Sequence, residues 1–165
     1  MNPHISAITL GVRDLAAAKR FYAEGLGWPI EQDYPQWVSF KMDDGSTMLG
    51  LYPREAFKFV QAGLAYTVEH IHAETANDPE ANHHVTGQQL CEGLREFALK
   101  EWGLLAPTVL KRWNITSTYD FGRIVFTLVE HEHMAKTDQD TVEDFRNVYD
   151  FKTAFDTNYK IECKS

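Results

Sequence analysis

The hydrophobic pattern of the chain changes its period near Pro53, and this change limits the folds that the chain can adopt. Before Pro53, short runs alternate apolar residues with small or polar ones, which is typical of strands with one buried face. After Pro53, apolar residues recur at the spacing of amphipathic helices. We therefore expect an α+β protein in which a strand-rich segment, residues 1–52, joins a mostly helical domain, residues 53–165.

The N-terminal segment is expected to contain a strand, a helix and a hairpin. Ile8, Leu10 and Val12 would lie on the core face of the strand, and Asp14 is a suitable N-cap for a helix that follows. Two further strand-like runs flank an Asp-Gly pair that tolerates the positive φ of a tight turn. The predicted order is βαββ, and no fourth strand is evident.

Three short segments of this part carry a family signature. They are Ile8-Thr9-Leu10-Gly11-Val12-Arg13-Asp14-Leu15, Arg20-Phe21-Tyr22 and Gly25-Leu26-Gly27-Trp28. Together they resemble the opening of a glyoxalase, or vicinal oxygen chelate, module. In that family a βαβββ unit forms half of a cleft and two units complete it. A His on the first strand and a Glu late in the module hold a divalent metal.

The positions where this resemblance implies metal ligands lack a donor atom. Alignment on the signature places Ala7 at the His position and Gly50 at the Glu position. Neither residue can coordinate a metal, which needs an imidazole nitrogen or a carboxylate oxygen. His4 is no substitute, because strand alternation would point it toward the helix and away from the cleft. We therefore expect no metal cofactor in this segment.

The C-terminal part is expected to form successive helices. Arg54–His70 has helical periodicity, a polar stretch at about 73–84 suggests a flexible loop, and Thr86 with Gln89 has the form of a capping box. Later helices are expected at Thr108–Trp113 and after Ser117, with a capped turn at Thr137–Asp140. An aromatic cluster near the end is expected to dock onto the core rather than to stack on a ligand; it comprises Phe145, Tyr149, Phe151 and Phe155.

Several segments of the C-terminal part carry a second resemblance. They include His84-Val85-Thr86-Gly87-Gln88-Gln89-Leu90, Ser117-Thr118-Tyr119-Asp120-Phe121-Gly122, Lys136-Thr137 and Glu143-Asp144-Phe145. In this order they resemble a family of small bacterial proteins of uncharacterised function, which supplies an organisation but no mechanism. A natural fusion, an engineered chimera and a mis-joined sequence all fit this arrangement.

The seven histidines raise the question of a second metal site. His131, Glu132 and His133 with His84 from the predicted loop would supply suitable donors. On a continuing helix, however, side chains two residues apart diverge, so both imidazoles of the pair reach one ion only if the chain is extended there. Solvated histidines at the ends of elements are the alternative.

The charge of the chain limits its partners. The net charge is −8, with four Lys/Arg against six Asp/Glu in residues 1–52 and twelve against eighteen in residues 53–165. Neither part has the basic surface that nucleic acid or an anionic membrane requires. No signal peptide or membrane span is evident, and Cys91 and Cys163 match neither a disulfide framework nor a zinc spacing. These features predict a soluble cytoplasmic protein.

Three functions are compatible with these patterns. The first is a binding or interaction module for a small molecule or a protein partner, without metal-dependent catalysis and without cofactors. The second is a lyase or dioxygenase that works as a homodimer, with a cleft lined by Thr9, Trp37, Ser39 and Met48. The third is a nucleic-acid-binding adaptor in which Thr108–Trp113 and the helix after it form a helix-turn-helix. The expected exposed face of the second helix opposes this hypothesis, because it is too acidic to sit against phosphates; it comprises Tyr119, Asp120, Arg123, Thr127 and Glu130.

Overall fold

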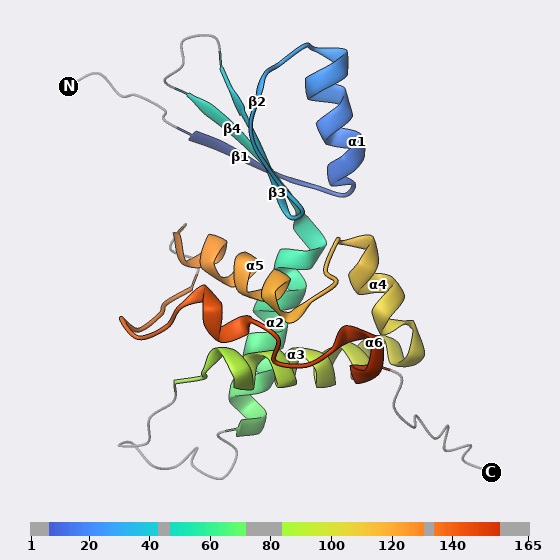
Figure 1. The fold of residues 1–165 in the computed structure, drawn as a ribbon, viewed down its shortest axis with the longest axis vertical. Helices are drawn as coiled ribbons and strands as arrows, with labels where there is room; N and C mark the ends of the chain where they lie inside the picture. The colour runs from blue at the N-terminus through green and yellow to red at the C-terminus, as the bar shows by residue number, and fades with distance from the viewer. Residues whose placement is uncertain (1–6, 43–46, 72–83, 131–133, 156–165) are drawn as a thin grey trace. The chain divides into compact units, whose positions relative to one another are not determined.

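The computed structural model of the chain describes residues 7–42, 47–71, 84–130 and 134–155 (Figure 1). It has an α+β fold, as predicted, and divides into two compact units, Met1–Phe57 and Lys58–Ser165. The boundary lies inside one helix, α2 (Arg54–Ile71).

A four-stranded mixed sheet forms the first unit, with strand order β1-β4-β3-β2. β1 runs parallel to β4, and the other two strand pairs are antiparallel. Between β1 and β2 lie the helix α1 and a short π-helical segment, η1. The bounds are β1 Ala7–Val12, α1 Leu15–Arg20, η1 Phe21–Gly25, β2 Ile30–Tyr34, β3 Trp37–Lys41 and β4 Met48–Pro53.

The strand β2 corrects the sequence prediction that the module lacks its fourth strand. With β2 present, the element order is a complete βαβββ. Apolar and polar residues do not alternate along β2 (Ile30–Tyr34), because every residue of this edge strand is exposed. Its pairing with β3 also shifts register between Ile30 and Gln32. Alternation reports a buried face, so an exposed edge strand leaves no such signal.

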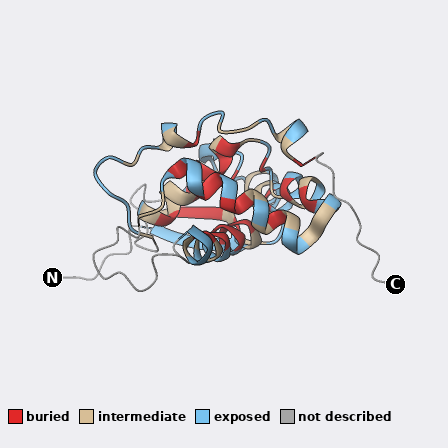
Figure 2. Cartoon of the chain, turned by 90° about the horizontal axis from the view of Figure 1, so that it is seen from below, coloured by how far each residue is buried: buried red, intermediate tan, exposed pale blue. Residues whose placement is uncertain are grey.

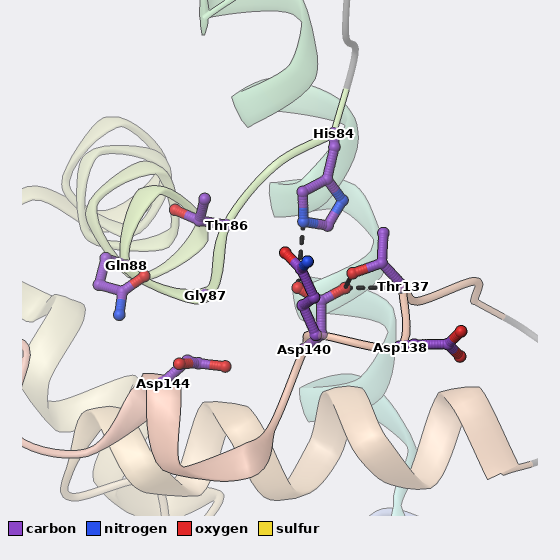
Figure 3. A pocket seen from close by; sticks show the side chains of 9 residues that line it. His84, Thr86, Gly87, Gln88, Thr137, Asp138, Asp140 and Asp144 are labelled. Atoms are coloured by element: carbon purple, nitrogen blue, oxygen red, sulfur yellow. Dashed lines mark hydrogen bonds and ion pairs between the residues drawn. The ribbon is translucent and has the colours of Figure 1, made fainter.

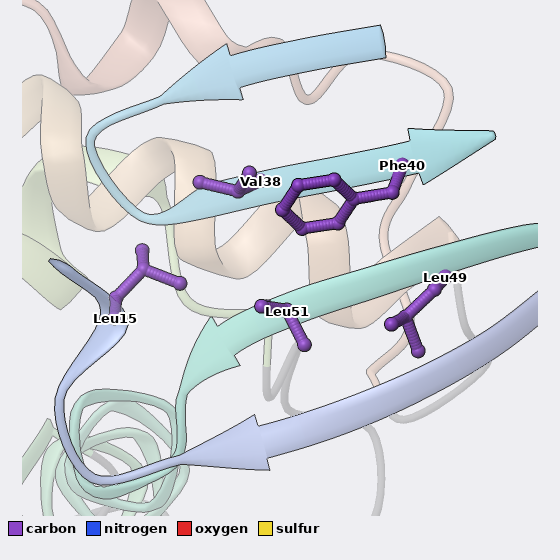
Figure 4. Packing of buried hydrophobic residues seen from close by; sticks show 5 residues of the cluster. All are labelled: Leu15, Val38, Phe40, Leu49 and Leu51. Carbon is purple, nitrogen blue, oxygen red and sulfur yellow. The ribbon is translucent and has the colours of Figure 1, made fainter. Parts of the chain in front are cut away.

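The core of the first unit lies on one face of the sheet, beneath α1. Val38 and Phe40 of β3 and Leu49 and Leu51 of β4 pack there with Leu15 of α1 (Figure 4). The capping of α1 is as predicted, since the Asp14 carboxylate accepts a hydrogen bond from the backbone N–H of Ala17 at 2.8 Å.

The predicted core face of β1 is only partly buried. Ile8 and Leu10 pair with Leu49 and Leu51, and thus share their face, yet each is 40% exposed. β1 is the end strand of the sheet, and the packed residues of α1 contact the core formed by β3 and β4. The sheet therefore presents apolar side chains at this edge.

The second unit consists of helices whose bounds follow the predictions closely, with buried and exposed residues on the same helix (Figure 2). Both hydrogen bonds of the predicted capping box form between Thr86 and Gln89. The polar stretch at about 73–84 lies mostly outside the described residues. The bounds are α2 Arg54–Ile71, α3 Gly87–Trp102, η2 Gly103–Leu105, α4 Ala106–Arg112, α5 Thr118–Glu130, η3 Val142–Phe145 and α6 Phe151–Ala154.

The predicted docking of the C-terminal aromatic cluster is confirmed. Phe145 and Phe155 are almost fully buried, and the ring of Phe151 lies 5.7 Å from that of Phe121 in α5. The hydroxyl of Tyr149 donates a hydrogen bond to the carbonyl of Cys91 at 3.0 Å. These contacts hold the segment after η3 against α3 and α5.

Candidate functional site

The four predicted cleft residues lie together on the sheet face opposite α1. Register pairs Thr9 with Gly50 and Gly50 with Ser39, so these positions form one row across β1, β4 and β3. Trp37 and Met48 are two residues from this row on β3 and β4, and strand alternation places them on the same face. The structure thus brings together the residues that the sequence analysis selected.

The indole of Trp37 covers the centre of this face. On one side its Nε1 donates a hydrogen bond to Oε1 of Gln32 at 3.1 Å. On the other side a Cβ atom added to Gly50 would lie 2.2 Å from the Cη2 atom of the same indole. Gln32 and Gly50 are the two cross-strand neighbours of Ser39, so the indole lies across Ser39.

Ser39 is consequently a buried polar residue without a partner. Its side chain is fully buried, and its Oγ has no hydrogen-bond partner within the part of the chain that the structure describes. An unsatisfied buried hydroxyl costs about 1–3 kcal/mol relative to a hydrogen-bonded one.

The residues of this face do not fit the divalent metal that the family resemblance implies. Gly50 stands at the position of the expected Glu, and any side chain there would collide with the indole of Trp37. Ala7 stands at the position of the expected His and pairs with Met48, whose thioether is a poor ligand for a hard cation. Neither expected position therefore supplies an imidazole or a carboxylate, and the indole fills the space a Glu would need.

A second aromatic ring completes the face. The ring of Tyr52 packs over Gly11, where an added Cβ atom would lie 3.1 Å from Cζ of the tyrosine. Both rings therefore rest on glycines, which let an aromatic side chain lie flat against the sheet. With the exposed Thr9 and the half-buried Met48, they form a largely apolar surface on this side of the sheet.

His84, one of the predicted metal ligands, is engaged with a carboxylate in the second unit. Its Nε2 lies 3.0 Å from Oδ1 of Asp140 (Figure 3). The other oxygen of Asp140 accepts hydrogen bonds from the backbone N–H and the hydroxyl of Thr137, at 2.7 and 2.9 Å. The remaining predicted ligands, His131, Glu132 and His133, lie outside the described residues, as does His4.

The surroundings of Asp140 favour its charged form. Burial alone would raise its pKa, but the two hydrogen bonds from Thr137 and the neighbouring His84 together hold the pKa below its ordinary value. Across the described ranges, no group of three or more His, Cys, Asp or Glu side chains is arranged to hold a metal ion.

His84 and Asp140 border a polar pocket of about 580 Å³. The pocket joins the start of α3 to the Thr137–Asp140 turn, so two segments of the second resemblance meet there. The sequence predicts His84 as a site residue but gives no signal for its partner Asp140, which lies 56 residues away along the chain. The capped turn at Asp140 was predicted, and only its position opposite His84 was not.

Two further reactive or charged side chains, Cys91 and Asp120, are buried in the second unit. Cys91 is fully buried, and its burial, with a smaller effect of Glu92, raises the pKa of the thiol to about 12, so it is no nucleophile at neutral pH. Asp120, expected on the exposed face of a recognition helix, is instead buried, which corrects that assignment. Its Oδ2 accepts hydrogen bonds from the backbone N–H groups of Thr116 and Ser117, both at 3.0 Å.

The comparisons with known proteins identify one family. The model described as the glyoxalase/bleomycin resistance protein/dioxygenase superfamily matches residues 4–150. No curated protein and no solved structure shows a significant match to the chain. Among the described residues, no helix combines the length and the apolar character needed to cross a membrane.

Proposed function

The chain belongs to the glyoxalase/bleomycin resistance protein/dioxygenase superfamily, and we propose that its βαβββ unit binds a small planar molecule without metal-dependent catalysis. The observation that carries this proposal is the position of Trp37. Its indole lies over Gly50, where a ligand to the metal would have to stand. The face that holds a metal in the family resemblance is thereby an aromatic surface in this chain.

The chemistry of the face defines the class of ligand. Trp37, Tyr52 and Met48 offer apolar contact area, which favours an aromatic or otherwise flat apolar molecule. The hydroxyl of Thr9, which is exposed on the same face, adds a preference for a ligand carrying a hydroxyl or carbonyl group. A planar aromatic alcohol has both properties.

A calorimetric titration with 2-naphthol tests this proposal. We expect binding that is the same with and without EDTA, because no metal takes part. We expect Trp37→Ala to weaken binding by at least about tenfold, since it removes the largest stacking surface, which is worth roughly 1–3 kcal/mol. Phe21→Ala is the matched control, because it removes a ring that is 58% exposed on η1, away from this face.

The alternative function is a metal-dependent lyase or dioxygenase acting as a dimer. A stoichiometric metal in protein purified without chelators, together with turnover of hemithioacetals or catechols that EDTA abolishes, would establish it. The same result would refute the proposed binding function. Equal binding of 2-naphthol by wild type and Trp37→Ala would also refute it, by showing that the ligand binds elsewhere.

A further inference from the structure

The polar pocket beside His84 adjoins a mostly apolar cavity within the second unit. The pocket measures about 580 Å³ and the cavity about 270 Å³. Four residues border both spaces, namely His84, Gly87, Asp140 and Asp144. The shared border shows that the two spaces adjoin, with a polar outer part and an apolar inner part.

Helices α2, α3 and α5 provide the walls of the inner part. Leu64 and Val68 of α2, Leu90 of α3 and Val125 of α5 line it, and Phe145 of η3 closes one side. An apolar cavity of about 150 Å³ is large enough to bind benzene. The inner part therefore has room for one aromatic ring or a branched aliphatic group.

The outer part is acidic. The carboxylates of Asp138, Asp140 and Asp144 border the two spaces. Among the described lining residues the one lysine is Lys136, whose Nζ donates a hydrogen bond to the carbonyl of Thr137. The net charge of these lining side chains is negative even when His84 is protonated. The N-terminus of α3 acts as about half a positive charge, which makes the net charge less negative but does not change its sign. A positively charged group is thus favoured here over a carboxylate or a phosphate.

We propose that this adjoining pair of spaces is a binding site for a small organic amine that carries an aromatic or branched aliphatic group. The ammonium group lies in the acidic outer part near Asp140 and Asp144, which border both spaces, and within the field of Asp138. The apolar group enters between α2 and α5, where it replaces water against Val68 and Val125. All residues of this site belong to the second unit, so the site is separate from the sheet face of the first.

Two probes of similar shape and opposite charge test the site. Titration calorimetry of the full chain at pH 7 and low salt should show that 2-phenylethylamine binds at least about tenfold more tightly than 3-phenylpropionate, because only the amine complements the carboxylates. Added salt should weaken the binding of the amine. Asp138→Asn, at an exposed position, should weaken it roughly two- to fivefold.

A pair of substitutions on α5 tests the location. Val125→Phe fills the cavity and should reduce amine binding at least about tenfold, whereas Val129→Phe, one turn further along and outside the lining, should not. Equal affinity for both probes, no binding of the amine at millimolar concentration, or full binding by a folded Val125→Phe variant would each overturn the proposal. If Val125→Phe does not fold, the relative affinities of the two probes and the effect of Asp138→Asn still test the proposed site.

Discussion

Asp140 shows how one side chain can hold together segments that are far apart in sequence. Its two oxygens accept from Thr137 and contact His84, so the turn at Thr137 and the chain entering α3 are joined at one carboxylate. These bonds require or favour the ionised form, which is why the pKa of Asp140 lies below its ordinary value although burial acts in the opposite direction.

The stability that Asp140 contributes should therefore depend on pH. A carboxyl whose pKa is lower in the folded chain stabilises the fold above its unfolded pKa, about 3.9, and loses this effect as the pH falls through the folded value. Asp140→Ala should cost about 1 kcal/mol at pH 7 and less at pH 3, measured by urea unfolding. Asp138→Ala is the control, because Asp138 is exposed in the same turn. An equal cost of Asp140→Ala at both pH values would show that its charge does not matter.

At the scale of elements, two helices of the second unit approach closely through glycines. A Cβ atom added to Gly63 of α2 would lie 2.3 Å from Leu94 of α3, and one added to Gly93 of α3 would lie 2.0 Å from Oγ1 of Thr67. Each helix thus places a side chain into the space that a glycine leaves on the other. Thr67 is buried, and its hydroxyl is satisfied by the carbonyl of Gly63 at 2.6 Å.

The contact between α2 and α3 should not tolerate a methyl group. We expect Gly93→Ala to destabilise the second unit by about 2 kcal/mol, because overpacking of about 1–3 kcal/mol exceeds the gain in helix propensity. Thermal unfolding followed by circular dichroism at 222 nm measures this effect. The double variant Thr67→Ala/Gly93→Ala should be more stable than Gly93→Ala alone, because the threonine that collides is removed. A stable Gly93→Ala variant would mean that the helices can move apart at no cost.

At the scale of the whole molecule, the described part of the chain contains the βαβββ order once. The family match spans residues 4–150 and so extends over both compact units, but all strands of the described structure lie in the first. In the family resemblance two such units complete a cleft, which a second copy of this chain would supply. The end strand β1, with Ile8 and Leu10 each 40% exposed, is the edge at which we propose that copy to pack.

A charged substitution on β1 tests this dimer. Light scattering coupled to size-exclusion chromatography should report a dimer for the wild type and a monomer for Leu10→Glu, because the carboxylate would be desolvated in the interface. Leu105→Glu is the control, since Leu105 is 65% exposed on η2. A monomeric wild type at concentrations of tens of micromolar, or a dimer that Leu10→Glu leaves intact, would contradict the proposed interface.

Properties that depend on neighbouring residues followed from the sequence alone. The change of period at Pro53, the cap at Asp14 and the capping box at Thr86 predicted elements that the structure contains. The absence of donor atoms at Ala7 and Gly50 is likewise a property of the residues themselves. Local periodicity and side-chain chemistry suffice for such conclusions, because the atoms concerned are close together in the chain.

Only the tertiary structure showed which residues that are distant in the sequence are neighbours in the fold. It showed that β2 is a strand although its residues are exposed, and that Ile8 and Leu10 are not fully covered. It also placed the indole of Trp37 over Gly50, and His84 against an aspartate 56 residues away. These facts depend on strand register and on the packing of distant segments. No local pattern encodes them, because each arises from the sum of many contacts across the fold.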